Sequence, residues 1–168
     1  MKLETQCLHA GYSPESTTNS CAVPVYKTSS FVFNNTEHAA NLFGLRELGN
    51  IYTRLMNPTT DVLEQRVAAM EGGAAGLGIA SGTSAVFYSI INIAQEGDEI
   101  ISANNLYGGT YTQFNDILPK FGIKVKFVDP NDPANFAAAI TDKTKALFCE
   151  SVSNPGLDVS DIKGIANV

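Results

Sequence analysis

From residue 74 onward, short apolar runs alternate with helix-like segments, and this alternation limits the possible folds more than any other feature. Each run predicts a strand and is followed by a predicted helix, over 74–80 and 83–95, 99–103 and 109–118, 124–128 and 133–140, and 145–150 and 160–168. The runs are apolar without alternation, as in strands that are covered by helices on both faces. Four such units joined by right-handed crossovers predict an α/β fold with a mostly parallel sheet.

The first part of the sequence lacks such a pattern. Residues 1–35 show no sustained periodicity and contain one short extended run, 22–33. Because a long segment without regular structure is unusual inside a compact domain, we expect an arm that packs on something else, such as a neighbouring subunit. We therefore divide the chain into an N-terminal arm and intersubunit segment, 1–57, and an incomplete large domain, 58–168.

Two helices are predicted before the alternating region. Residues 36–49 are typical of a helix that is ended by a glycine. Asn57 and Pro58 are typical of a helix start, and Gly72 with Gly73 is typical of a helix end. The apolar face expected on this second helix consists of Val62, Leu63, Val67 and Met70.

The composition disfavours several classes of function. The chain has 168 residues, a net charge of −6 and no dense run of lysine and arginine, so binding to nucleic acid or to an anionic membrane is not expected. No apolar run is long enough to span a bilayer, and the N-terminus lacks the apolar core of a signal peptide. Three widely spaced cysteines predict reduced thiols in the cytoplasm and do not have the spacing of a metal site.

The stretch SGTSA, residues 81–85, follows a predicted strand and opens a predicted helix. The amides of Gly82 and Thr83 are then free donors on the first turn, where the helix dipole favours an anion. Gly82 lets the backbone approach a ligand closely, and the hydroxyl group of Ser81 can add a hydrogen bond. A phosphate group is the expected ligand, and the alternative is an ordinary helix cap. The stretch lacks both the lysine of a P-loop and the glycine pattern of a Rossmann fold.

A second candidate is Arg54, one of three arginines, which follows Tyr52 in the stretch YTRLMNPT. A guanidinium group binds phosphate through two hydrogen bonds, and the tyrosine hydroxyl group is a further donor. The alternative is an arginine exposed in a surface loop.

In an open α/β sheet, ligands bind beyond the carboxyl ends of the strands. Tyr107 in the stretch LYGGTY lies at such an end. Its ring can stack on a flat aromatic ligand, and its hydroxyl group can take part in acid–base chemistry. Glu150 and Asn154 in CESVSNP lie at the next strand end. The alternatives are a core tyrosine and ordinary turn residues.

Together these motifs resemble one enzyme family. YTRLMNPT, SGTSA and LYGGTY, with ETQCLHAGY in the arm, are similar to the Cys/Met-metabolism family of pyridoxal-phosphate enzymes, which has the aspartate-aminotransferase-like (type I) fold. The resemblance covers essentially all 168 residues and is strongest to the O-acetylhomoserine sulfhydrylases of that family. It implies that residues 58–168 belong to the large domain that binds pyridoxal 5′-phosphate.

The resemblance also implies which residues contact the phosphate group of this cofactor. Gly82 and Thr83 would donate their backbone amides, with the hydroxyl group of Ser81 beside them. Tyr52 and Arg54 would reach the phosphate of the neighbouring subunit, across the subunit interface.

Three further roles follow from the resemblance. Tyr107 would stack on the pyridine ring and take part in catalysis. Asn154 would lie near the ring hydroxyl group or the substrate carboxylate, with Glu150 as its support. No metal ion is implied.

The activity implied for the full-length enzyme is replacement of the acetate group of O-acetyl-L-homoserine by sulfide or a thiol, which gives homocysteine or methionine. A cytoplasmic homo-oligomer, typically a homotetramer, is implied as well. The lysine that binds the cofactor in this family lies beyond residue 168, so we expect an N-terminal part that is inactive alone. The alternatives are an enzyme like cystathionine γ-synthase or methionine γ-lyase, and a noncatalytic cofactor-binding or assembly fragment.

Overall fold

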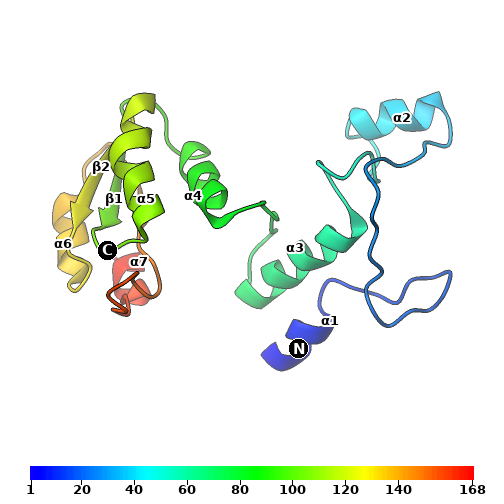
Figure 1. The fold of residues 1–168 in the computed structure, drawn as a ribbon, viewed down its shortest axis with the longest axis horizontal. Helices are drawn as coiled ribbons and strands as arrows, with labels where there is room; N and C mark the ends of the chain where they lie inside the picture. The colour runs from blue at the N-terminus through cyan, green and yellow to red at the C-terminus, as the bar shows by residue number, and fades with distance from the viewer. The chain divides into compact units, whose positions relative to one another are not determined.

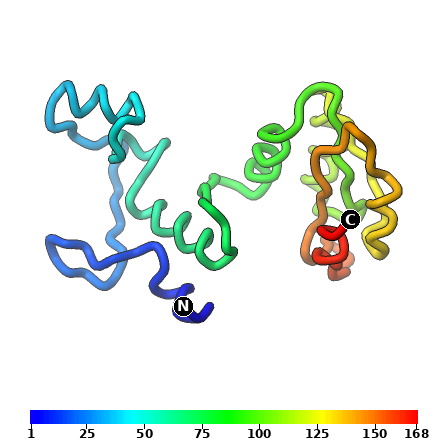
Figure 2. The backbone as a smooth tube through the Cα atoms, turned by 180° about the vertical axis from the view of Figure 1, so that it is seen from behind, coloured from blue at the N-terminus to red at the C-terminus, as the bar shows by residue number.

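The computed structural model describes residues 1–168, which form two compact units, Met1–Gly78 and Ile79–Val168. Figures 1 and 2 show the course of the chain through each unit from two opposite sides. None of the helices is both long enough and apolar enough to cross a membrane.

The first unit contains three helices, and the third of them begins and ends as predicted. They are α1 (Leu3–His9), α2 (Thr36–Phe43) and α3 (Pro58–Glu71). The side chain of Asn57 caps α3 by accepting a hydrogen bond of 2.9 Å from the amide of Thr59. Gly72 ends the helix in the left-handed conformation, with φ of 65°.

The prediction of a helix as far as Gly49 was wrong for its second half. Helix α2 ends at Phe43 because the chain turns at Gly44, and the amide of Arg46 then donates to the carbonyl oxygen of Asn41. Gly49 instead lies against Leu42, where a Cβ atom on the glycine would be 2.9 Å from a leucine methyl carbon. The second glycine therefore marks a close contact with α2 rather than its end.

The predicted apolar face of α3 is only partly buried. Val62 is buried, and so is Ala68, whereas Leu63, Val67 and Met70 are exposed. Helix α1 packs on α3, and Arg66 of α3 donates from Nε to the carbonyl oxygen of Ala10 over 2.9 Å. The start of the N-terminal arm thus packs on the first unit itself.

The second unit contains a three-stranded parallel sheet in the order β2–β1–β3. The strands are β1 (Glu99–Ala103), β2 (Lys124–Val128) and β3 (Thr144–Phe148). All five residues of β1 are buried, as expected for a central strand with both faces covered. The helical segments of this unit are α4 (Gly82–Ile91), α5 (Gly108–Thr112), a π-helical turn (Gln113–Ile117), a 3₁₀ turn (Leu118–Phe121), α6 (Pro133–Ala139) and α7 (Ile162–Ala166).

The core of the second unit joins the sheet to these helices. Phe114 and Phe136 are fully buried, and the ring of Phe114 meets that of Phe148 edge to face with 4.8 Å between the centroids. The other buried apolar residues of the cluster are Ile90, Ala94, Ile100, Ile101, Ala103, Leu106, Leu118, Ile123 and Ile165.

The strand predicted over 74–80 does not form. The backbone of Gly76 and Gly78 instead follows α3, and the amide of Gly78 donates to Oε1 of Glu64 over 2.7 Å. A Cβ atom on Gly76 would lie 2.6 Å from the carbonyl oxygen of Glu64, so only glycine allows this approach. The hydrogen bond to Glu64 satisfies an amide that the prediction assigned to a sheet, and the sheet has three strands rather than four.

Candidate functional site

Helix α4 begins with an open set of hydrogen-bond donors. Ser81 caps the helix, because its Oγ accepts from the amide of Ser84 over 3.1 Å and donates to Oγ of Ser84 over 2.9 Å. The amides of Gly82 and Thr83 on the first turn have no acceptor in the structure. Both residues are exposed, and a Cβ atom on Gly82 would meet nothing within 4 Å. This helix start therefore offers free amides and the positive end of the helix dipole to an anion.

Tyr107 and Glu150 are brought together beyond the ends of β1 and β3. The amide of Tyr107 donates to both carboxylate oxygens of Glu150, at 3.0 and 3.1 Å. Tyr107 immediately precedes α5, and about half of its surface, 51 %, is exposed. The sequence placed both residues at strand ends but assigned Glu150 as the support of Asn154, whereas in the structure its carboxylate binds the amide of Tyr107.

Asn154 lies in the exposed turn after Glu150, and its side chain forms no hydrogen bond. The turn is held by its neighbours, since Oγ of Ser153 donates to Asp158 over 3.1 Å and accepts from the amide of Asp158 over 2.9 Å. The amide group of Asn154 is thus free to contact a ligand, but no contact joins it to Tyr107 or Glu150.

Tyr52 and Arg54 belong to the first unit and line a hollow of about 450 Å³. The guanidinium carbon of Arg54 lies 5.5 Å from the centre of the Tyr52 ring, within the range of a cation–π contact. Backbone hydrogen bonds join the two sides of the hollow, including one of 2.9 Å from the amide of Thr53 to the carbonyl oxygen of Ser29. The rest of its lining comes from Tyr26, Lys27 and Thr28.

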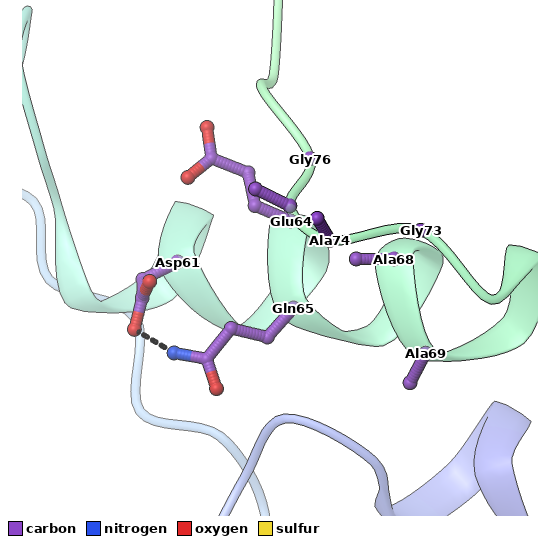
Figure 3. Close-up of a pocket in the computed structure, with 9 residues that line it drawn as sticks. Asp61, Glu64, Gln65, Ala68, Ala69, Gly73, Ala74 and Gly76 are labelled. Atoms are coloured by element: carbon purple, nitrogen blue, oxygen red, sulfur yellow. Dashed lines mark hydrogen bonds between the residues drawn. The ribbon is translucent and has the colours of Figure 1, made fainter.

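This hollow has two cationic side chains, Lys27 and Arg54, and no acidic residue. The hollow beside α3 has a volume of about 360 Å³ and the opposite charge, because its lining includes Asp61 and Glu64 (Figure 3). There Gln65 donates to Asp61 over 2.6 Å. Of these two hollows in the first unit, the one beside Arg54 has the charge to bind an anion.

Sequence reasoning missed three residues at these places. Lys27 and Tyr26 lie in the predicted extended run, and in the structure they line the same hollow as Arg54. Gln113 was also missed. It is buried and donates from Nε2 to the carbonyl oxygen of Thr83 over 3.3 Å, whereas its Oε1 has no partner. A signal for Lys27 was present in the sequence, because a chain of net charge −6 placed a lysine in an otherwise uncharged run.

The thiol group next to Glu150 is not a reactive one. Burial raises the pKa of Cys149 above its ordinary value, and a hydrogen bond with Ser160 opposes this only in part. Because the thiolate is the reactive form, Cys149 is a poor nucleophile at neutral pH.

Comparisons with known proteins agree on one group of enzymes. Residues 4–168 match the family described as Cys/Met metabolism PLP-dependent enzyme. O-acetyl-L-homoserine sulfhydrylase of Leptospira meyeri is 56% identical over 167 residues, which are 99% of this chain and 38% of that protein. This chain therefore spans about two fifths of the length of the curated relatives that it matches.

Solved structures give the same result. A crystal structure of a proposed O-acetylhomoserine (thiol)-lyase of Campylobacter jejuni, which contains N′-pyridoxyl-lysine-5′-monophosphate, has a TM-score of 0.91 and 44% identity. The match covers 99% of this chain and 41% of that one. Cystathionine γ-lyase of Lactobacillus plantarum, complexed with L-serine, has a TM-score of 0.86 and 36% identity, over 99% of this chain and 41% of that enzyme. These matches confirm the predicted α/β fold class and the resemblance carried by the motifs.

Proposed function

This chain belongs to the family of Cys/Met metabolism PLP-dependent enzymes, and we propose that it is the N-terminal part of an O-acetylhomoserine sulfhydrylase. The complete enzyme would replace the acetate group of O-acetyl-L-homoserine by sulfide or a thiol, as a step of methionine biosynthesis in the cytoplasm. The 56% identity to a sulfhydrylase over 99% of the chain supports this substrate class.

The observation that carries the cofactor assignment is the start of α4. A phosphate dianion has only acceptor atoms, and the two unpaired amides of Gly82 and Thr83 are donors on a helix turn with a favourable dipole. The hydroxyl group of Thr83 adds a further donor, and so does that of Ser84, whereas the proton of the Ser81 hydroxyl group is donated to Ser84. These residues therefore fit the phosphate group of pyridoxal 5′-phosphate.

Tyr107 and Asn154 would orient the ring of the same cofactor. The half-exposed ring of Tyr107 offers a surface on which a pyridine ring can stack. Asn154 has a free amide group that can donate to the ring hydroxyl group or to a substrate carboxylate. When bound, pyridoxal phosphate supplies a ring that accepts electrons while bonds of an amino acid are broken.

Tyr52 and Arg54 would bind the phosphate of a cofactor held by a second subunit, so we propose a homo-oligomer that is at least a dimer. The support is the cationic, acid-free hollow that these residues line with Lys27. We also propose that the 168 residues alone do not turn over, because the lysine motif of the family has no counterpart among their lysines.

The experiment is an assay of the complete protein with O-acetyl-L-homoserine and sulfide, in which homocysteine is measured. Parallel reactions contain O-succinyl-homoserine with cysteine, and methionine alone, because an enzyme like cystathionine γ-synthase and one like methionine γ-lyase are the alternatives. We expect the first pair to give the highest kcat/KM. A clear preference for either parallel reaction would replace the sulfhydrylase by a γ-synthase or a γ-lyase. No turnover by the complete protein, with no cofactor bound, would favour a noncatalytic fragment.

A further inference from the structure

The backbone at the start of α5 is anchored by a carboxylate that is distant in sequence. The amide of Tyr107 belongs to the residue before the first turn of α5, and its own side chain does not cap the helix. Both oxygens of Glu150, 43 positions later, accept a hydrogen bond from this amide, at 3.0 and 3.1 Å. Hydrogen bonds to a charged acceptor are among the stronger ones in proteins, so this contact fixes the backbone of Tyr107.

Glu150 is itself held in place. Its carbonyl oxygen accepts a hydrogen bond of 2.7 Å from the hydroxyl group of Ser160. Its carboxylate has no lysine or arginine partner within salt-bridge distance. The carboxylate is therefore available to the amide of Tyr107.

Gly109 fixes the side chain of the same tyrosine. A Cβ atom on Gly109 would lie 2.5 Å from Cε1 of Tyr107, and within 3.3 Å of two further ring atoms. Real Cβ atoms do not approach carbon atoms so closely, so the ring can lie against the backbone at this position only because the residue is glycine. Gly108, one position earlier, has nothing within 4 Å of its own Cβ position.

We infer that Glu150 and Gly109 are positioning residues that together hold the Tyr107 ring as a preformed stacking surface for a planar cofactor. Glu150 fixes the backbone of Tyr107, and Gly109 leaves the space against which its ring lies. In this arrangement Glu150 acts on the cofactor through Tyr107 rather than by touching it. The inference rests on the proposed function for the identity of the cofactor, but not for the anchoring of Tyr107.

The first measurement tests the anchoring without any cofactor. Hydrogen exchange of the Tyr107 amide is measured in the complete protein after removal of pyridoxal phosphate. We expect Glu150→Ala to accelerate exchange about tenfold, and Glu150→Gln to restore most of the protection because it keeps one acceptor oxygen. Glu71→Ala, in an exposed carboxylate without a hydrogen bond, is the control and should leave this amide unchanged. Unchanged exchange in Glu150→Ala would overturn the anchoring.

The second measurement tests the route from Glu150 to the cofactor by a double-mutant cycle on the dissociation constant of pyridoxal phosphate. We expect Glu150→Ala, Gly109→Ala and Tyr107→Ala each to weaken binding about tenfold, with Gly108→Ala as the matched glycine control near the wild-type value. In the Tyr107→Ala background, neither Glu150→Ala nor Gly109→Ala should weaken binding further. If Glu150→Ala still weakened binding there, the carboxylate would contact the cofactor directly and the inference would be wrong.

The two failures are distinguishable. If Tyr107→Ala leaves the dissociation constant unchanged while hydrogen exchange still reports the anchor, Tyr107 does not stack on the cofactor and the proposed role of that residue fails. Glu150→Gln and Gly109→Ala change few atoms, and their thermal unfolding is recorded beside the wild type, so a loss of folding is separated from a loss of positioning.

Discussion

Lys126 of β2 donates from Nζ to Oε2 of Glu99, the first residue of β1, over 2.7 Å. The same carboxylate oxygen accepts from the hydroxyl group of Thr141, also at 2.7 Å. The hydrogen bond from Lys126, and to a smaller extent that from Thr141, lowers the pKa of Glu99 below its ordinary value of 4.5. The carboxylate therefore links β1, β2 and the turn before β3, and these contacts favour its ionised form.

A depressed pKa in the folded state means that Glu99 stabilises the fold above its ordinary pKa, and that this contribution is lost as the pH falls through the lowered value. We expect Glu99→Gln to reduce the free energy of unfolding at pH 7, and the difference from the wild type to shrink below about pH 4.5. Urea unfolding at several pH values measures this difference. Glu71→Gln is the control, and a difference that stayed constant down to pH 3 would contradict the role of ionisation.

Much of the second unit could be predicted from the sequence, because its elements are defined locally. The apolar runs at 99–103 and 124–128 coincide with β1 and β2 residue for residue. The run at 74–80 is also apolar, although it contains two glycines, and it forms no strand, since its amide at Gly78 pairs with Glu64. An apolar run indicates only that a segment can be buried in a sheet. Which groups its backbone amides pair with depends on tertiary contacts.

The candidate site shows the same limit. Tyr107 and Glu150 could be placed at two strand ends from the sequence, because parallel strands bring their carboxyl ends to one edge, but the order β2–β1–β3 that makes these strands neighbours was not predicted. The direction of the hydrogen bond, from a backbone amide to the carboxylate, could not be predicted from residue types. Lys27 and Arg54 line one hollow because the backbones of two irregular segments pair with each other. Such pairing produces no periodic pattern in the sequence from which it could be predicted.

The side chain of Asn57 joins three parts of the first unit, and its replacement should be costly. It accepts from the amide of Thr59 and donates to the carbonyl oxygen of Tyr26 over 2.9 Å and to Oγ1 of Thr53 over 3.1 Å. We expect Asn57→Ala to lower the free energy of unfolding by about 2–4 kcal/mol, because a cap is lost and buried polar groups lose a partner. Urea unfolding of this variant and of Asn35→Ala, which removes only an exposed cap on α2, should separate the two effects, with about 1 kcal/mol for the control. Equal losses would show that the donor contacts of Asn57 do not contribute.

Gly11 combines a left-handed backbone with a close contact. Its φ is 73°, and a Cβ atom there would lie 2.8 Å from Cβ of Gln65 and 3.0 Å from the amide nitrogen of Arg66. We expect Gly11→Ala to destabilise the first unit and to release α1 from α3, which limited proteolysis after Lys2 and between α1 and α3 would detect. Gly72 has a similar φ of 65° but open space around its Cβ position. Gly72→Ala should therefore lose only the backbone contribution to the free energy of unfolding, about 1 kcal/mol. If the two variants were equally stable, the close contact of Gly11 with α3 would not contribute to stability.

The three thiol groups should differ in reactivity. Cys7 and Cys21 are exposed, whereas Cys149 is partly buried and its pKa is raised by that burial. We expect iodoacetamide at pH 7.5 to label the two exposed cysteines first, and Cys149 only slowly until the pH is raised or the protein is unfolded. Mass spectrometry of the tryptic peptides over time measures the three rates, with the urea-unfolded chain as the reference. Labelling of Cys149 as fast as that of Cys7 would show that its environment is open.

Arg54 provides the sharpest test of a site shared between subunits. In the complete protein, Arg54→Ala should weaken the binding of pyridoxal phosphate about ten- to a hundredfold, because a charged hydrogen bond contributes about 1.5–3 kcal/mol. Arg46→Ala, in an exposed arginine away from that hollow, is the control. Equilibrium dialysis gives the two dissociation constants, and similar values would remove Arg54 from the phosphate site.

A mixture of subunits then decides whether Arg54 acts across the interface. Subunits with Arg54→Ala are unfolded, mixed with subunits that carry Tyr107→Ala, and refolded together. If Arg54 serves the site of its partner, each hybrid dimer contains one intact site and one with both defects, so about a quarter of all sites regain tight binding. If Arg54 serves the site of its own subunit, every site keeps one defect and nothing is regained. Recovery in the mixture, absent from either parent refolded alone, is therefore the result expected from the proposed homo-oligomer.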